Sequence, residues 1–579
     1  MTMVLKQMQS NEITLKRTSA ILSHKFFRYL LPSLLTMAAF SLSEFADSML
    51  VSNLLGANAM AIIQLGFPFV MIASTACILI GNGGSTLYSI ALGEHNRDKA
   101  GSIFTLSMIF ALILGLSIYA VEVCFFNPLA DFVCKDEALI SEFKSYLFVL
   151  LFSSPVFILF LAFVFFLPAS GAPVLATLIH IIANVVNILM DYVYIHIFNL
   201  GVKGAAWATL TGYITAIIFT AFALKFLHVD IRIHRPGKKD FSFIKNIAVT
   251  GSPFSINQLG FAIKFSFFNT FVAALGGTTA LVAFSLCVQS ISIVTIFIGA
   301  ALQATMPLVA LLHGQKDFQG EKRLLRISYI TQFIFSSVCA VYFIFFSKSF
   351  AFLYDIKSGD AHTLAVYALK IFALQYFIRG FYIIFMPYLQ ILGHKIYSIL
   401  ISVFDGFAGN ILLSLILCKF IGLDGIWWSF PLTAVFLFAF FLIVNRKIQK
   451  KPENPPVIDI TVVNNDSDIS EVSKKAQDAF IKAGLDSKTA LKAAILIEET
   501  AVFTKKRTGK NGYLDILTAF YEDRVEIDFR SIGATGNIEE KTENDIEENI
   551  RFLESLSDKI QYDFIMGMSS MRIIINKRS

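Results

Sequence analysis

"NILMDYVYIHIFNLGVKGAAWAT", residues 187–209, joins two long apolar segments through a short polar break. Within the first segment lies a carboxylate, Asp191, among aliphatic and aromatic side chains. A charged carboxylate at the centre of a bilayer costs at least about 2.5 kcal/mol, so such residues persist mainly where they bind, pair or conduct. If both segments span a membrane, Asp191 is therefore a candidate functional residue.

The composition places most of the chain in lipid. Of 579 residues, 56% are hydrophobic, 16% are charged and 59 are Phe, far from the make-up of soluble globular proteins. The first apolar run, near 26–51, is too long for a signal-peptide core and lacks a cleavage site, so we expect an uncleaved first span. The six Cys residues lack the paired spacing of metal sites, and we expect neither structural disulfides, nor a metal, nor a cofactor.

Apolar runs of about 20 residues predict twelve transmembrane helices, hence an all-α polytopic membrane protein. With a cytoplasmic N-terminus, most Lys and Arg of this region fall on the cytoplasmic side. The positive-inside rule therefore predicts a multi-pass protein of the plasma membrane with both termini in the cytoplasm. The predicted spans are 26–52, 60–91, 102–126, 145–168, 172–198, 204–227, 246–274, 280–312, 327–349, 362–391, 396–420 and 424–445.

Landmark residues of the spans recur at a fixed offset of 221 residues. The repeat divides the membrane region into two six-helix bundles, 26–227 and 246–447, related by an axis along the membrane normal. A cytoplasmic segment, 1–25, precedes them, and a basic cytoplasmic linker, 228–245, joins them. Two bundles around a cavity are typical of a carrier, and no channel-like filter is visible. The repeated pairs are Pro32 and Pro253, Gly56 and Gly277, Gly93 and Gly314, Gly204 and Gly425, and Trp207 and Trp428.

Three acids break the repeat and belong to the first half alone. Glu44, Asp47 and Asp191 each correspond, at this offset, to an apolar residue of the second half. Positions i, i+4, i+7 and i+11 of the fifth span fall on one helix face and carry His180, Asn184, Asn187 and Asp191. Any function that needs a carboxylate is therefore expected in the first bundle.

The segment 187–209 resembles the fifth-to-sixth-span signature of the multidrug and toxic compound extrusion (MATE) transporters, in which Asn and Asp, four residues apart, precede "GxxGAAxAT". The stretches "SEFADSMLVSNLLGANAMAII" (43–63) and "LDGIWWSFPLT" (423–433) are similar to other parts of that family's pattern. The likeness extends over about residues 20–447. It implies a secondary transporter that exports small molecules.

The resemblance also implies a cation-coupling site for H⁺ or Na⁺ in the first bundle. Oxygen ligands suit a hard cation, and a carboxylate can instead take a proton. Carried over position by position, the site comprises Asp47, Asn187, Asp191 and Thr209. Further candidates for the cavity or the coupling site are Glu44, Asn184 and His180. The plainer role of all these residues is hydrogen bonding between helices.

The second bundle departs from the family. Sodium-coupled relatives often carry acids on the seventh and tenth spans, whereas the seventh span here, "SINQLGFAIKFSFFN", offers Lys264. Asp405 corresponds to Asn184 of the first bundle, and we expect it to line the cavity or to pair with Lys264 or Arg379. A salt bridge or snorkelling to the interface is the plainer role of Lys264.

After a linker, 448–456, the composition changes abruptly. Residues 457–579 carry a net charge of -5, against +11 for the preceding part. Their pattern predicts an α+β domain: a strand at 457–464, helices at 468–484 and 487–507, two strands within 512–531, a helix at 545–558 and two closing strands.

This domain resembles a histidine-kinase-type ATPase of the anti-sigma-factor kinase sort, through "LKAAILIEETAVF" (491–503), "RSIGATGN" (530–537) and "MGMSSMRIII" (566–575). In that family a metal-binding Asn follows a Glu by four residues, but Glu498 and Glu499 are followed there by Val502 and Phe503. The family's adenine-binding acid is replaced by Ser531, two residues before Gly533. We therefore interpret the domain as a degenerate regulatory or docking module, with residual nucleotide binding as the alternative.

Three functions are compatible with these features. The leading hypothesis is an antiporter, not an enzyme, that exports amphipathic or cationic small molecules by alternating access in exchange for H⁺ or Na⁺. No GxxxxGK[ST] phosphate loop is present, so ATP-driven transport is disfavoured. The alternatives are a lipid-linked oligosaccharide flippase and a membrane sensor that signals through 457–579. The expected partners are the bilayer, the transported molecules and a cytosolic regulatory protein, but no nucleic acid.

Overall fold

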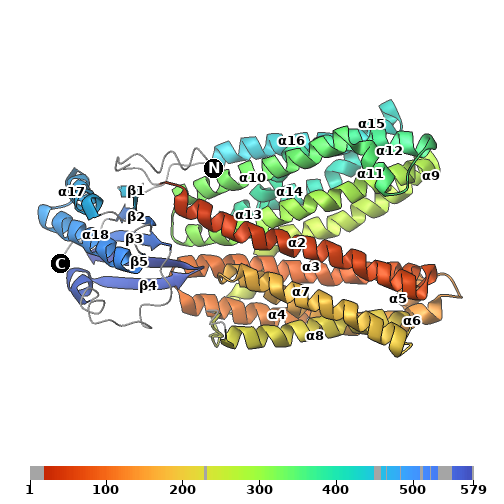
Figure 1. The fold of residues 1–579 in the computed structure, drawn as a ribbon, viewed down its shortest axis with the longest axis horizontal. Helices are drawn as coiled ribbons and strands as arrows, with labels where there is room; N and C mark the ends of the chain where they lie inside the picture. Colours follow the sequence, from red (N-terminus) through yellow and green to blue (C-terminus); the bar gives the residue numbers. More distant parts are fainter. Residues whose placement is uncertain are drawn as a thin grey trace. The chain divides into compact units, whose positions relative to one another are not determined.

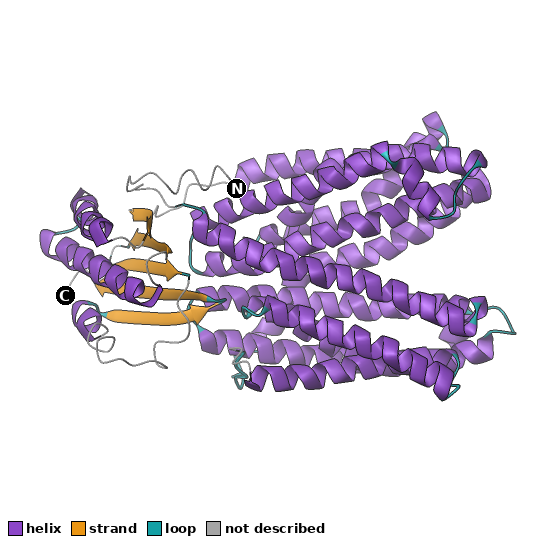
Figure 2. Ribbon diagram, in the orientation of Figure 1, coloured by secondary structure: helices purple, strands orange, loops and turns teal. Residues whose placement is uncertain are grey.

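The computed structural model describes residues 18–226, 231–448, 458–463, 466–482, 484–508, 513–521, 523–532 and 551–576. Two compact units are distinguished: Phe26–Ile448, and Met1–Lys25 together with Gln449–Ser579. Long helices make up the first unit, and all the described strands belong to the second (Figure 2). Glu44 lies on a helix, but its side chain is outside the described residues.

The first bundle consists of helices that match the first six predicted spans (Figure 1). The helices extend a few residues beyond the apolar runs, because polar residues form their first turns; Asn96, for example, accepts a hydrogen bond from the Lys99 amide at 2.9 Å. The elements are α2 (Ala20–Leu55), α3 (Ala57–Gly93), α4 (Arg97–Cys124), α5 (Phe126–Val133), α6 (Ile140–Ala169), α7 (Pro173–Asp191), η1 (Tyr192–Ile197) and α8 (Val202–Phe226).

The second bundle begins with α9 (Ser242–Gly314), which consists of two helices that meet at a kink and contain the seventh and the eighth predicted span. The predicted division between these two spans is confirmed: Gly277, within the interval 275–279, has a non-helical φ of 61° and ψ of -156°. Eleven described helices are long and apolar enough to cross a membrane, and the two arms of α9 account for the twelfth predicted crossing. The remaining elements are α10 (Phe318–Phe345), α11 (Ser347–Leu353), α12 (Gly359–Phe372), η2 (Ala373–Gln375), α13 (Tyr376–Ile391), α14 (Lys395–Val403), η3 (Phe404–Ala408), α15 (Gly409–Ile421) and α16 (Asp424–Ile448).

The 221-residue repeat is confirmed in the backbone. Gly56 and Gly277 both adopt positive φ, at 82° and 61°, where the first and second helices of each bundle meet. The short helices α5 and α11, which the sequence analysis did not predict, also begin 221 residues apart. Asp317 caps α10 through the Gly320 amide at 2.8 Å, as Asn96 caps α4. The two bundles therefore share turns as well as spans.

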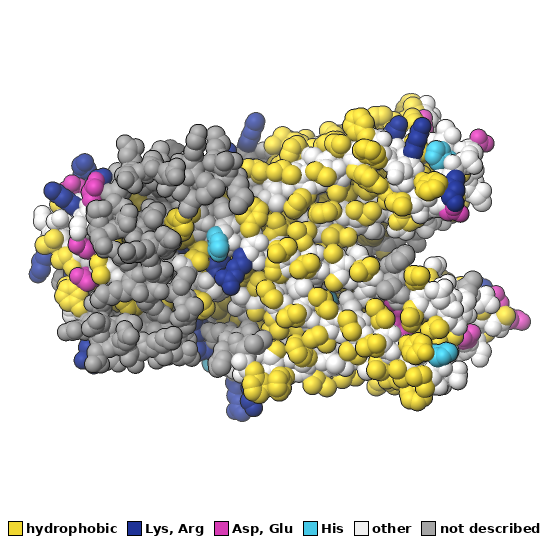
Figure 3. Space-filling view, in the orientation of Figure 1, with side chains coloured by type: hydrophobic (Ala, Val, Ile, Leu, Met, Phe, Trp, Pro, Cys, Tyr) yellow, Lys and Arg dark blue, Asp and Glu magenta, His cyan; other side chains and the backbone are white. Residues whose placement is uncertain are grey.

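Four glycines bring α3 and α9 into backbone contact at the end of the bundles where α3 terminates. A Cβ atom at Gly93 would stand 2.1 Å from the Leu311 carbonyl oxygen, and one at Gly314 would stand 2.1 Å from that of Ile90. A Cβ atom at Gly83 would stand 2.1 Å from the Ile247 carbonyl oxygen, and one at Gly251 would stand 1.8 Å from that of Leu79. We call these four residues the glycine seam. At the opposite end, near Gly56, the surface is hollowed between the bundles (Figure 3).

The second unit is a five-stranded antiparallel sheet with the strand order β1-β2-β3-β5-β4. Its core contains residues from α17, α18 and the sheet, and β3 and β5 contribute the pair Ile527 and Ile573. The predicted succession of strands and helices is confirmed, and 551–556 form part of the predicted helix 545–558. The elements are β1 (Ile458–Val463), α17 (Asp466–Lys482), α18 (Ser487–Thr508), β2 (Tyr513–Phe520), β3 (Arg524–Ser531), β4 (Lys559–Ile565) and β5 (Met568–Asn576).

Candidate functional site

Two carboxyl groups face each other inside the first bundle. Asp47 lies on α2 and Asp191 is the last residue of α7, and their carboxyl groups lie close enough to interact electrostatically. A proton on one of them would remove the repulsion between two adjacent carboxylates. Asp191 has no exposed surface. Apart from this mutual contact, no described group donates a hydrogen bond to Oδ1 of Asp47 or to either oxygen of Asp191.

Asn187 and Thr209 form a second pair, and Asn187 lies four residues before Asp191 in the sequence. The Asn187 amide donates to the Thr209 hydroxyl at 3.2 Å, and Thr209 donates to the Ala205 carbonyl at 3.0 Å. The contact between Asn187 and Thr209 joins α7 to α8 one turn before α7 ends. Directly after Asp191 the chain continues as the π-helix η1, a geometry that is frequent at functional sites. The structure thus groups the four predicted coupling residues as two contacting pairs.

His180 and Asn184 do not join the acids. The His180 ring is 8% exposed and packs edge-on against Phe160 and Phe40, with ring centroids at 5.8 and 6.5 Å. It is therefore part of an aromatic contact between helices. The Asn184 amide nitrogen is buried and has no partner among the described residues.

In the second bundle, Asp405 is the centre of a polar cluster. Of the two expected arrangements, the structure shows pairing: its Oδ2 lies 3.5 Å from Nη2 of Arg379. The Tyr382 hydroxyl donates to Oδ1 at 3.0 Å and the Asn257 amide donates to Oδ2 at 3.4 Å. Lys264 donates to the Asp405 main-chain carbonyl at 2.8 Å. We name these five residues the Asp405 cluster.

Lys264 does not snorkel, because it is only 2% exposed and its ammonium group lies at the cluster. The sequence analysis missed Asn257 and Tyr382. Asn257 precedes Lys264 by seven residues, two helical turns, and this spacing could have identified it as a residue of the same face. Tyr382 gave no such signal, because its contact depends on how α13 packs against η3.

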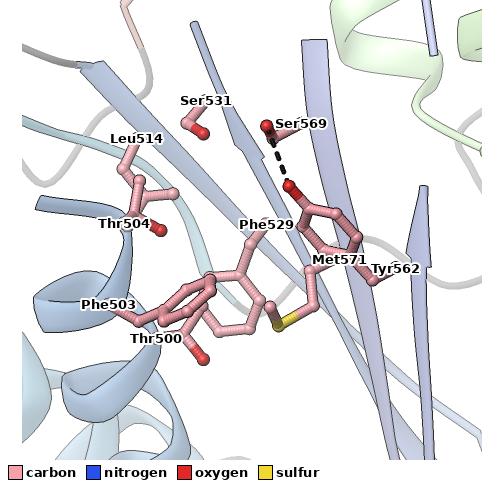
Figure 4. Close-up of a pocket in the computed structure, with 9 residues that line it drawn as sticks. All are labelled: Thr500, Phe503, Thr504, Leu514, Phe529, Ser531, Tyr562, Ser569 and Met571. Carbon is pink, nitrogen blue, oxygen red and sulfur yellow. Dashed lines mark hydrogen bonds between the residues drawn. The ribbon is translucent and has the colours of Figure 1, made fainter. Parts of the chain in front are cut away.

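The C-terminal unit has a small pocket between α18 and the sheet (Figure 4). Ser531 lies at this pocket, whereas Glu498 accepts a hydrogen bond from Ser470 at 3.1 Å and Gly533 lies outside the described residues. Glu499 is not part of the lining either. The lining has no carboxylate, amide or basic side chain; it consists of Thr500, Phe503, Thr504, Leu514, Phe529, Ser531, Tyr562, Ser569 and Met571.

The family model MatE matches this chain over residues 32–193 and 253–416, one segment in each bundle. The probable multidrug resistance protein YoeA of Bacillus subtilis is 22% identical over 455 residues, which cover 76% of this chain and 97% of YoeA. The multidrug export protein MepA of Staphylococcus saprophyticus is 24% identical over 63% of this chain and 81% of its own length. An FAD transporter of Shewanella oneidensis is 25% identical over 64% and 81%, respectively.

Solved structures share the fold. A multidrug resistance MATE transporter of the MOP superfamily, in an outward-facing conformation, aligns with a TM-score of 0.68 and 21% identity over 74% of this chain and 96% of that one. A MOP superfamily transporter from Pyrococcus furiosus, described as having a binding pocket of reverse polarity, aligns with a TM-score of 0.67 and 21% identity over 76% and 99%.

Proposed function

Because the chain belongs to the MatE family of membrane transporters, we propose that it is a secondary antiporter that exports amphipathic or cationic small molecules. The names of YoeA and MepA, which refer to multidrug resistance and export, support this choice of cargo. The protein would act in the plasma membrane with both termini in the cytoplasm, as the distribution of Lys and Arg predicts.

The pair of Asp47, which is half-buried, and Asp191, which is fully buried, is the observation behind the proposal. Two adjacent carboxyl groups in a bilayer cannot both stay charged at low cost, so they take up a cation or a proton. Because a proton on one of two adjacent carboxyl groups removes their mutual repulsion, we propose H⁺ as the coupling ion, with Na⁺ as the alternative. One charge moving across 100 mV supplies about 2.3 kcal/mol, enough for a roughly fifty-fold cargo gradient.

The two ends of the bundles support alternating access. The glycine seam closes the end at Gly93, while the surface is hollowed at the end near Gly56 (Figure 3). With the N-terminus in the cytoplasm, the hollow faces outward. Asp47 lies in the last third of α2, toward the hollow, so protons would reach it from outside. Their arrival would then favour release of the cargo to that side.

For the C-terminal unit, we propose a regulatory or docking role toward a cytosolic protein, without enzymatic activity. Among the described residues, the pocket beside α18 is lined by hydroxyl groups but by no carboxylate that could hold Mg²⁺ and no basic side chain that could neutralise a phosphate, and Phe503 lines it. Titrating ATP and Mg²⁺ into the purified full chain should give no binding heat. Measurable binding would support the residual nucleotide site instead.

Gradient-driven dye efflux from proteoliposomes tests the export proposal. We expect an imposed pH gradient to drive efflux, and a sodium gradient at equal pH on both sides to have no effect. Efflux driven by sodium alone would assign the coupling to Na⁺. Efflux under neither gradient, with a lipid-linked precursor accumulating in cells that lack the protein, would support the flippase.

A further inference from the structure

The Asp405 cluster contains more positive than negative charge. Lys264, Arg379 and Asp405 are 2%, 9% and 4% exposed, so two cations and one carboxylate are buried together. Asn257 and Tyr382, the other members, are uncharged. A buried charge without a counter-charge is costly, and within membrane proteins such residues mark binding or conduction sites.

Both cations keep hydrogen-bonding capacity that the described residues do not use. The Lys264 ammonium has three donors, and it contacts one carbonyl and the rings of Phe261 and Phe430, whose centroids lie at 5.4 and 6.0 Å. Arg379 reaches Asp405 through a single contact of 3.5 Å, and its Nε has no partner among the described residues. The guanidinium group is suited to bidentate binding of a carboxylate or a phosphate.

We propose that Lys264 and Arg379 bind an anionic group of the transported molecule, a carboxylate or a phosphate. This inference rests on the proposed export function and narrows its cargo. The second bundle presents a surplus cation, so the preferred cargo carries an anionic group on the same apolar body as the cation of the proposed function. Asp405 positions Arg379, and its main-chain carbonyl positions Lys264.

Two dyes that differ only in the anionic group test the inference. Rhodamine B has a cationic ring system and a free carboxylate, and its methyl ester keeps the cation alone. Their Kd values are measured with the purified full-length protein, and their export is measured in proteoliposomes. We expect rhodamine B to bind about tenfold more tightly than the ester, as a charge-assisted contact allows.

Variants of Lys264 test whether the preference for rhodamine B over its ester depends on the Asp405 cluster. Lys264→Met should raise the Kd of rhodamine B about tenfold and leave that of the ester unchanged, and Lys264→Arg should keep the preference. Because Lys264→Met also removes the surplus charge, it is expected to fold; Arg379→Gln provides a second test. Lys348→Met, at an exposed position on α11, is the matched control and should bind both dyes as the wild type does.

Equal binding of the two dyes by the wild type, or equal weakening of both in Lys264→Met, overturns the anionic subsite. Export of the ester in the same vesicles then leaves the proposed export function intact. Binding that prefers rhodamine B and depends on Lys264, without gradient-driven export of either dye, supports the subsite and contradicts the export function.

Discussion

Asp405 and Asp191 are both acids buried inside a helix bundle, but their surroundings differ. The Asp405 carboxylate is held by a guanidinium, a phenol and an amide, so its charge is stabilised in place. The Asp191 carboxyl has only another carboxyl, that of Asp47, among the described groups. Asp405 therefore stabilises the second bundle, whereas Asp191 remains available to exchange a proton.

This contrast predicts opposite effects of the same substitution on stability. Asp405→Asn leaves two buried cations without their carboxylate and should lower the free energy of unfolding by about 3–5 kcal/mol. Asp191→Asn removes a repulsive carboxylate and should be neutral or stabilising. Thermal unfolding of the detergent-purified proteins measures both, and a larger loss for Asp191→Asn would contradict the assignment.

The Tyr382 hydroxyl should contribute measurably to the same cluster. Tyr382→Phe removes its 3.0 Å hydrogen bond to Asp405, which should cost about 1.5–3 kcal/mol because the acceptor is charged. Tyr367→Phe removes a 3.3 Å bond to Asp424 at an exposed position and should change the melting temperature little. Equal shifts of the melting temperature in the two variants would show that the hydrogen bond from Tyr382 to Asp405 adds no stability.

Some of these site residues can be predicted from the sequence, and others cannot. The cost of a carboxylate in lipid is enough to identify Asp47 and Asp191 from the sequence alone. The partner of Asp405, by contrast, depends on how α13 approaches η3, and the sequence left its pairing open between Lys264 and Arg379. Its contact with Tyr382 was not foreseen for the same reason.

At the level of elements, the apolar runs predict the long helices well, because about 20 apolar residues suffice to span the bilayer. The short helices α5 and α11, of 8 and 7 residues, escape this criterion. The π-helices η1 and η3 are also missed, since their hydrogen-bond pattern leaves no trace in hydrophobic periodicity. The kink that divides α9 into two helices lies at one glycine, Gly277, whose positive φ suits that residue.

We predict that the glycine seam acts as a gate at the end of the bundles where α3 terminates. Gly93→Ala and Gly314→Ala each place a methyl group where backbone atoms of the other helix lie, so α3 and α9 must separate there. We expect cysteine labelling near the seam to increase at least several-fold and export to fall. Gly237→Ala, where a Cβ would meet only an atom at 3.7 Å, is the control. Unchanged labelling in both seam variants would exclude a gating role.

The first turn of α18 offers a pH-dependent element outside the membrane. The pKa of Asp486 is lowered because the Thr489 side chain and amide hydrogen-bond to its carboxylate. The cap therefore stabilises α18 above the unfolded-state pKa and is lost as pH falls through the lowered pKa. Asp486→Ala should speed amide exchange in the first turn at neutral pH. The difference should vanish near pH 2; a difference that persists there would contradict the cap.

For the whole molecule, the repeat could be predicted because the 221-residue offset is visible in glycine, proline and tryptophan positions. The seam and the hollow could not, since both depend on how two bundles of similar sequence tilt against each other. We propose that one bundle carries exchangeable acids and the other carries fixed charges. The first would take up the driving ion, and movement about the seam would carry the cargo outward.

The most direct test measures dye efflux and proton flux together in proteoliposomes with an imposed pH gradient. We predict that dye movement drives a matching proton flux in the wild type, and that Asp47→Asn and Asp191→Asn abolish both fluxes but retain dye binding. Asp355→Asn, at a position whose side chain is 81% exposed, should behave as the wild type. Gradient-driven efflux that continues unchanged in the double variant of Asp47 and Asp191 would contradict the account.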